Sequence, residues 1–259
     1  MSENDEITQR AEQEFVWPQV RRFGMDAPWR WLRAGWGDLR AAPGASLFYG
    51  AVLAVMGFVL TRYATGAAGL AFVTGFFLVG PFFAVGIYDL SRRRAAGEQI
   101  GLAPTLSAWR ANFPAIGFYA LILMLSLAIW IRVSVVVVAL FFPHGVPTWA
   151  AIAQQLAKSP DPWVFILAYL AAGSGIALMV FATSAVSLPM LLDRRNMDTV
   201  SAMIVSFNVL RANFRPMLLW GAIIVALTAA GFASFYLGLV LVLPLIGHAS
   251  WHAYREAVD

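Results

Sequence analysis

The chain of 259 residues contains no cysteine, and Lys158 is its single lysine among eighteen basic residues. The lack of cysteine excludes disulfides, thiolate metal sites and cysteine nucleophiles. No lysine stands in a phosphate-binding loop, no Gly-rich turn lies between a strand and a helix, and no serine, histidine and acid form a recognisable triad motif. We therefore expect no enzyme activity and no cofactor.

Charge is also scarce. Only 12% of the residues are charged, against about 25% in ordinary soluble domains, while 60% are hydrophobic and the mean hydropathy is +0.72. Such a chain has too little polar surface to cover a soluble globule, so we expect a surface that faces lipid. The basic residues alternate with hydrophobic stretches instead of forming one face, which argues against a nucleic-acid partner.

Long apolar stretches predict an all-α, polytopic membrane protein, since a spanning helix needs roughly 20 apolar residues. The region from Met217 to Trp251 is too long for one span, and Thr228–Gly231 near its middle predicts a tight turn between two short helices. Six transmembrane helices result. Besides the two in that region, they are Ser46–Thr61, Ala67–Tyr88, Ala115–Ile131 and Trp163–Leu192.

The basic residues give this topology an orientation. If both termini and the two long polar loops lie on one side, fifteen basic residues lie there, and only Arg62 and Lys158 lie on the other side. The positive-inside rule then places both termini in the cytoplasm. The first fourteen residues hold five acids and one arginine, with no apolar segment or cleavage site of a signal peptide, so insertion depends on the internal spans.

The chain also repeats itself three times. Similar junctions at residues 39–43, 109–114 and 210–216 each precede an apolar hairpin, and a second proline follows late in each hairpin, at Pro81, Pro189 and Pro244. We predict three repeats of an amphipathic helix plus a helical hairpin, at about 26–94, 104–195 and 198–255, around a pseudo-threefold axis. Residues 26–259 form a single membrane domain, and residues 1–25 form a polar, disordered cytoplasmic segment.

The helix that opens each repeat has recognisable signals. Asp26 is placed to cap a helix with Pro28 in its first turn. Asp198 likewise precedes a helical stripe, and residues 104–113 form a shorter version. We expect the apolar stripes to pack against the spans or to lie at the membrane interface. The stripes consist of Trp29, Leu32, Trp36 and Leu39 in the first repeat, and Val200, Met203, Ile204, Phe207, Leu210 and Phe214 in the third.

The middle repeat carries an insertion of about residues 133–162. It pairs the apolar run Val133–Phe142 with Pro147–Lys158, which resembles a short amphipathic helix. Because only one of the three repeats has this segment, it is the place where we expect contact with a partner outside the cytoplasm; structural filler is the alternative.

The C-terminal region holds the best local candidate for chemistry. His248, His252 and Glu256 stand at i, i+4 and i+8, so one helix face could present them to a metal. No fourth ligand lies nearby, and bonding to neighbouring helices is the simpler interpretation, so we assign no metal. Trp251, Tyr254 and Arg255 belong to the same stretch and are further functional candidates.

Arg132 is the one basic residue that could lie within the hydrocarbon, and such residues are candidates for a substrate or ion role. It lies 18 residues beyond Pro114, or about 27 Å along a helix, near the outer edge of the bilayer, where snorkelling also explains it. No carboxylate lies at mid-span, as a coupled carrier would usually require.

The run 27–39, the entry from Pro43 to Gly50 and the ending Pro244–Arg255 together resemble a family of bacterial integral membrane proteins, domain of unknown function 2189. The resemblance implies a bacterial inner-membrane location and no established activity. Members are sometimes labelled after cytochrome oxidase subunit I, but that enzyme needs more histidine ligands than the three histidines present here. The label leaves only a hint of a respiratory-chain partner.

Two functions follow as hypotheses. The first is a non-enzymatic accessory or scaffold protein that binds other membrane components besides the lipid bilayer. The second is a transporter of a small solute or lipid, which requires a polar cavity between the repeats.

Overall fold

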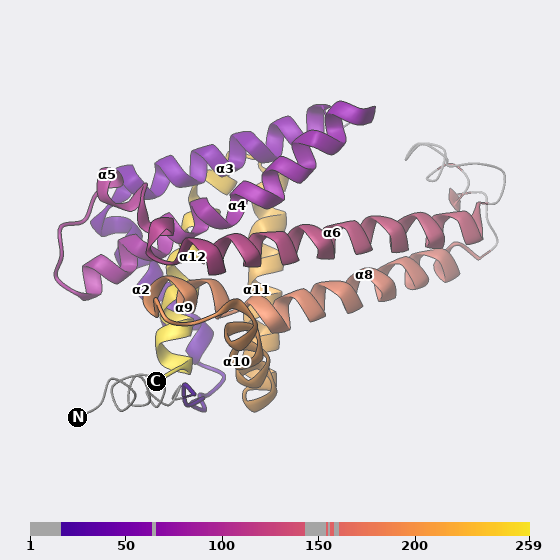
Figure 1. The fold of residues 1–259 in the computed structure, drawn as a ribbon. Helices are drawn as coiled ribbons and strands as arrows, with labels where there is room; N and C mark the ends of the chain where they lie inside the picture. The colour runs from indigo at the N-terminus through magenta and orange to yellow at the C-terminus, as the bar shows by residue number, and fades with distance from the viewer. Residues whose placement is uncertain (1–16, 64–65, 143–153, 155, 158–160) are drawn as a thin grey trace, which may run out of the picture.

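The computed structural model describes residues 17–63, 66–142, 154, 156–157 and 161–259, and it describes residues 61–63 and 66–79 by their backbone alone (Figure 1). This part of the chain is helical and contains no β-strand, apart from one isolated bridge between Val20 and Val258. The predicted all-α class is therefore confirmed.

Along the chain, a short helical segment precedes each of three pairs of long helices. The first group is α2 (Ala27–Ala41), α3 (Pro43–Tyr63) and α4 (Gly66–Ala95). The second is α5 (Leu102–Thr105), the 3-10 helix η1 (Ala108–Asn112), α6 (Phe113–Phe141), α8 (Pro162–Ser184) and the short α9 (Ser187–Asp193). The third is α10 (Thr199–Ala212), α11 (Phe214–Ala233) and α12 (Leu239–Ala257).

Within the described residues, four helical segments are long and apolar enough to cross a membrane: Pro43–Leu60, Leu102–Phe141, Pro162–Asp193 and Phe214–Ala233. They correspond to four of the six predicted spans. The other two predicted spans lie in α4 and α12, which are not among these segments. In α12 the second half carries two histidines, an arginine and a glutamate, which lowers its hydropathy.

The turn in the last apolar region lies later than predicted. Residues 228–231 belong to α11, and the chain reverses between Ala233 and Leu239 instead. Phe235 and Tyr236 have φ angles of 54° and 69°, which non-glycine residues adopt in tight turns. Ser234 supports this turn, because its hydroxyl accepts a hydrogen bond of 2.9 Å from the Gly238 amide. Phe235 and Tyr236 are not residue types that indicate a left-handed turn, so the sequence did not show where this turn lies.

Helix α6 is also longer than predicted. It continues past Ile131 to Phe141, so the apolar run assigned to an insertion is the end of one helix of 29 residues. Helix α8 runs beside it (Figure 1), and the Phe142 and Phe165 rings meet at 5.1 Å near the end of the hairpin. Most of the predicted helix Pro147–Lys158 lies outside the described residues.

The short helices α2 and α10 present an unexpected face to the protein. In α2 the buried residues include Trp31, Gly35 and Asp38, whereas Trp29 and Trp36 of the predicted stripe are 59% and 40% exposed. Helix α10 likewise buries a face of small residues around Ala202 and Ser206, while Val200, Ile204, Phe207 and Phe214 are exposed. Each predicted stripe is therefore only partly buried: Leu39 is 4% exposed and Leu210 is 6% exposed, whereas the other bulky members named above face outward.

The two predicted caps differ. Asp198 caps α10, since its carboxylate accepts a hydrogen bond of 2.9 Å from the Ser201 amide. Asp26 makes no such bond; its carboxylate pairs with Arg30 one turn later. The proline predicted in the first turn of α2 is present there.

Helix α12 lies at the centre of the packing, against α2, α3, α4 and α11. Its close approach to α2 requires glycine, because a Cβ on Gly35 would lie 2.7 Å from the Ala249 amide nitrogen. The segment before α2 is held beside the end of α12: the Arg21 amide donates to the Ala257 carbonyl at 2.9 Å, and the Asp259 amide donates to the Gln19 carbonyl at 3.1 Å. Of the predicted disordered segment 1–25, residues 17–25 are described.

Candidate functional site

The three predicted metal ligands on α12, His248, His252 and Glu256, each bind different residues. His248 is fully buried, with Nε2 2.9 Å from Ser46 Oγ on α3 and Nδ1 2.7 Å from Ser91 Oγ on α4. In a neutral imidazole one ring nitrogen donates and the other accepts, so the two serines complete its hydrogen bonding.

His252, one turn later, bonds to Asp38 of α2, with Nε2 2.8 Å from Oδ2. The other oxygen of Asp38 accepts from the guanidinium of Arg94 at 2.6 Å. Burial alone raises the pKa of Asp38, but hydrogen bonds from His252, Ser91 and Arg94 more than offset burial and hold the pKa below its usual value. The hydrogen bonds of His248 and His252 therefore join α12 to α2, α3 and α4.

Glu256 lies away from both histidines. Its carboxylate accepts a hydrogen bond of 2.8 Å from the indole Nε1 of Trp31 and pairs with Arg30. Within the described part of the chain, no group of three His, Asp or Glu side chains lies together as possible metal ligands. The spacing i, i+4, i+8 therefore serves three separate contacts with neighbouring helices.

Trp251, Tyr254 and Arg255 also bind neighbouring helices. The Tyr254 hydroxyl donates to Oδ2 of Asp193 at 2.8 Å, and Arg255 donates to the same oxygen at 3.0 Å, which holds α9 against α12. Burial raises the pKa of Tyr254 to about 12. Trp251 is 2% exposed and lies 5.5 Å from the Tyr254 ring.

Arg132 lies inside α6, exposed, with no ion pair to any described residue. Nine further residues of the helix follow it, so it does not mark the end of the apolar helix as the sequence suggested.

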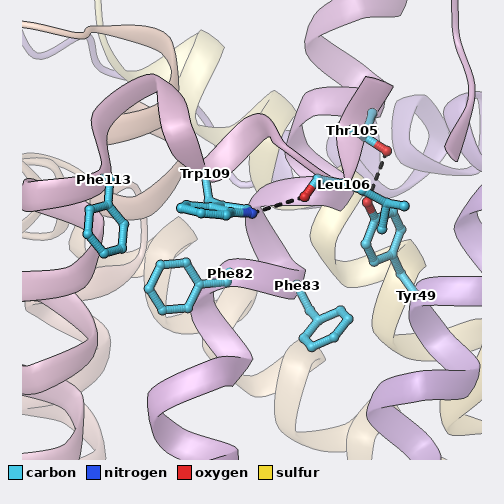
Figure 2. A pocket seen from close by; sticks show the side chains of 7 residues that line it. All are labelled: Tyr49, Phe82, Phe83, Thr105, Leu106, Trp109 and Phe113. Atoms are coloured by element: carbon cyan, nitrogen blue, oxygen red, sulfur yellow. Dashed lines mark hydrogen bonds between the residues drawn. The ribbon is translucent and has the colours of Figure 1, made fainter. Parts of the chain in front are cut away.

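No signal in the sequence indicated the aromatic pocket that residues of α3, α4, α5 and η1 form together with Phe113. Its volume is about 390 Å³, and Figure 2 shows its lining residues Tyr49, Phe82, Phe83, Thr105, Leu106, Trp109 and Phe113. The Tyr49 hydroxyl lies 2.9 Å from Thr105 Oγ1, and Trp109 Nε1 donates to the Leu106 carbonyl at 3.0 Å. These bonds satisfy the polar atoms and leave aromatic faces around the space. We call it the aromatic pocket.

A second space of about 360 Å³ borders the same segment. Its charged lining consists of Arg92, Arg93, Arg110 and Arg195 with Asp89 and Asp193. We call it the arginine pocket. The Arg-rich junctions were used for topology at the sequence level, and nothing in their spacing showed that arginines from α4, η1 and the loop after α9 converge.

A third space of about 390 Å³ lies where the three hairpins meet. We call it the central cavity. Residues of α3, α4, α6, α8, α9, α11 and α12 line it. Most are apolar, and polar atoms come from Tyr88, Tyr119, Ser184 and Ser250. Such a space suits an apolar or weakly polar molecule better than an ion.

Comparison with known proteins gives one match. Residues 69–193, from α4 to the end of α9, match the family described as predicted integral membrane protein, DUF2189. The matched stretch contains the middle hairpin and most of the residues that line the aromatic pocket, and it ends before α11 and α12. No curated protein and no solved structure matches the chain. Over these residues, the chain is similar to the integral membrane protein family DUF2189, as its sequence led us to expect.

Proposed function

We propose that this is a six-span protein of the bacterial inner membrane, with both termini in the cytoplasm, that acts as a non-enzymatic accessory or scaffold protein. The observation that carries the proposal is the apolar surface at the end of the α6–α8 hairpin. We call residues 133–142 and 161–169 the hairpin tip.

The length of α6 supports this interpretation. Its 29 residues correspond to about 43 Å, which exceeds a hydrocarbon core of about 30 Å. If Phe113 lies at the cytoplasmic interface, Arg132 is about 28 Å further along, near the outer interface. The hairpin tip then extends beyond the lipid.

The surface of the hairpin tip is nevertheless apolar. Leu140 is 75% exposed, Trp163 68%, Leu167 64% and Val136 57%. Within the tip, α6 and α8 are joined by the Phe142–Phe165 ring contact and by a hydrogen bond of 2.8 Å between Ser134 Oγ and the Tyr169 hydroxyl. A large apolar patch outside the hydrocarbon marks an interaction site, so we assign the tip to contact with another membrane protein.

Two equivalent asparagines support the threefold arrangement. Asn112, at the second junction, donates to the carbonyl of Met197, just before α10. Asn213, at the third junction, donates to the carbonyl of Arg21, just before α2. The second and third junctions therefore each hold the segment before a short helix, and the third contacts the segment before the first short helix. Ala42, at the first junction, packs in the same cluster as Ile100 and Leu102, at the entry to α5.

Site-specific photocrosslinking in cells tests the partner assignment. A benzophenone amino acid replaces Leu140 or Leu167 in the tip, and Val225 on α11, 69% exposed, serves as the control. We expect both tip positions to form a covalent adduct with the same second protein and the control to form none. Absence of a protein adduct at both tip positions, or an adduct with a second copy of this chain alone, would refute the accessory role.

The central cavity favours a second candidate, transport of a lipid or small apolar solute. Its test is lipid exchange between leaflets in proteoliposomes. Ala84→Phe fills the cavity, and Ala229→Phe adds the same bulk to an exposed position of α11. If the protein transports lipid, exchange should be faster in vesicles with the protein than in empty vesicles. Ala84→Phe should abolish this difference and Ala229→Phe should not. Equal rates with and without protein exclude this candidate for lipids.

A further inference from the structure

The segment Leu102–Asn112 separates the aromatic pocket from the arginine pocket. Leu106 and Trp109 line the aromatic pocket, whereas Ser107 and Arg110 line the arginine pocket. The Arg110 guanidinium lies over the Trp109 ring, 5.2 Å from its centroid, so the two spaces share this stacked pair as their border.

Some of the arginine side chains that line the arginine pocket are not neutralised by acidic side chains and could bind an anionic ligand. The Asp89 carboxylate accepts one hydrogen bond of 2.7 Å from Arg92 and another of 2.7 Å from Arg93. The Asp193 carboxylate accepts a hydrogen bond from Arg255. Arg110 and Arg195 have no acidic partner among the described residues. Two uncompensated guanidinium groups in one pocket are complementary to a phosphate group.

The two pockets also have the spacing of a lipid. On α4, Arg92 and Arg93 follow Phe82 and Phe83 by ten residues, or about 15 Å along the helix. The headgroup layer of one leaflet is roughly 5–7 Å thick, so 15 Å reaches from the phosphate into the upper acyl chain. Phe113 lines the aromatic pocket and is 52% exposed, so the pocket lies at the surface of the protein.

We propose that this border binds one anionic phospholipid from the leaflet at the arginine-rich end of the protein. Its phosphate bonds to Arg110 and Arg195, and an acyl chain enters the aromatic pocket against Trp109 and Phe113. The inference goes beyond the accessory role and does not depend on the hairpin tip. The net positive charge selects an anionic lipid over a zwitterionic one.

Native mass spectrometry of the detergent-solubilised protein tests the site, with phosphatidylglycerol and phosphatidylcholine titrated separately. The chain offers a matched control, because Arg110 and Arg211 occupy the same position of two repeated junctions, Arg-Ala-Asn-Phe. Arg211 is exposed and lines neither pocket. We expect R110Q to weaken phosphatidylglycerol binding by about fivefold and R211Q to leave it unchanged. R110K keeps the charge but loses the planar guanidinium, so it should bind more tightly than R110Q and less tightly than the parent protein.

Four outcomes would overturn the proposal. They are equal binding of the two lipids, equal weakening by R110Q and R211Q, binding by R110K that is no tighter than binding by R110Q although R110K elutes as a folded monodisperse protein, and displacement of phosphatidylglycerol by glycerol 1-phosphate at similar concentration. The last result would show that the headgroup alone is held. R195Q provides an independent variant of the same pocket, and retention of full phosphatidylglycerol binding by R195Q would also count against the site.

Discussion

The side-chain amide of Asn213 donates a hydrogen bond of 2.9 Å to the Arg21 carbonyl, and its oxygen accepts one of 2.9 Å from the Phe23 amide. One side chain thus satisfies two backbone groups of a segment 190 residues away. Asn112 donates in the same way to the carbonyls of Leu191 and Met197.

Replacing Asn213 with alanine should lower the free energy of unfolding by about 1–3 kcal/mol, because it removes two hydrogen bonds to partly buried backbone groups, each of which contributes about 0.5–1.5 kcal/mol. Asn208→Ala, at an exposed position of α10, is the control and should cost little. Thermal unfolding in detergent, followed by tryptophan fluorescence, measures both. Equal melting temperatures for the two variants would show that Asn213 does not hold the N-terminal segment.

Asp38 should make stability depend on pH in the acidic range. Its pKa is lowered in the folded protein, so the stability contributed by its ionised form is fully present above the unfolded value of 3.8 and is lost as the pH falls through the folded value. Asp38→Asn should therefore lower the melting temperature at pH 7, and its difference from the parent protein should shrink below pH 3.8. A difference that stays constant with pH contradicts this assignment. Asp26→Asn changes an exposed pair and should have a small effect.

His248 and Ser46 should behave as a coupled pair. His248→Leu leaves the buried Ser46 hydroxyl without its partner, whereas the double variant with Ser46→Ala removes both polar groups. We expect the double variant to lose less stability than the sum of the single variants, by about 1 kcal/mol. Additive losses in a thermal or chemical unfolding series would mean that the two groups do not interact.

The absence of cysteine makes the topology directly testable. Asp259→Cys should resist a membrane-impermeant maleimide in intact cells and react after permeabilisation, whereas His144→Cys, which follows α6 in the sequence, should react in intact cells. Labelling of Asp259→Cys from outside would reverse the proposed orientation. Labelling of both positions from the same side would rule out an odd number of crossings between them.

The sequence predicted the helical class and the element order well, because apolar length and repeated junctions are local signals. Periodicity predicted only part of the buried faces of α2 and α10. Leu39 and Leu210 are buried as the stripes require, but Trp31 of α2 and Ala202 of α10 are buried through packing against α12 and α8, which periodicity does not show. Similarly, the even spacing of His248, His252 and Glu256 suggested one site, but their partners come from α2, α3 and α4, whose positions depend on tertiary packing. The aromatic and arginine pockets were missed for the same reason.

The contact between α2 and α12 has a consequence for how the protein is made. Helix α2 leaves the ribosome well before α12, yet its buried face, with Trp31, Gly35 and Asp38, has α12 as its main neighbour. Until α12 is synthesised, Trp31 lacks its acceptor Glu256 and Asp38 lacks its bond to His252, although Arg94 of α4 can already pair with Asp38. Assembly therefore finishes after translation of α12, and nascent chains stalled before it should be substrates for membrane chaperones and quality-control proteases.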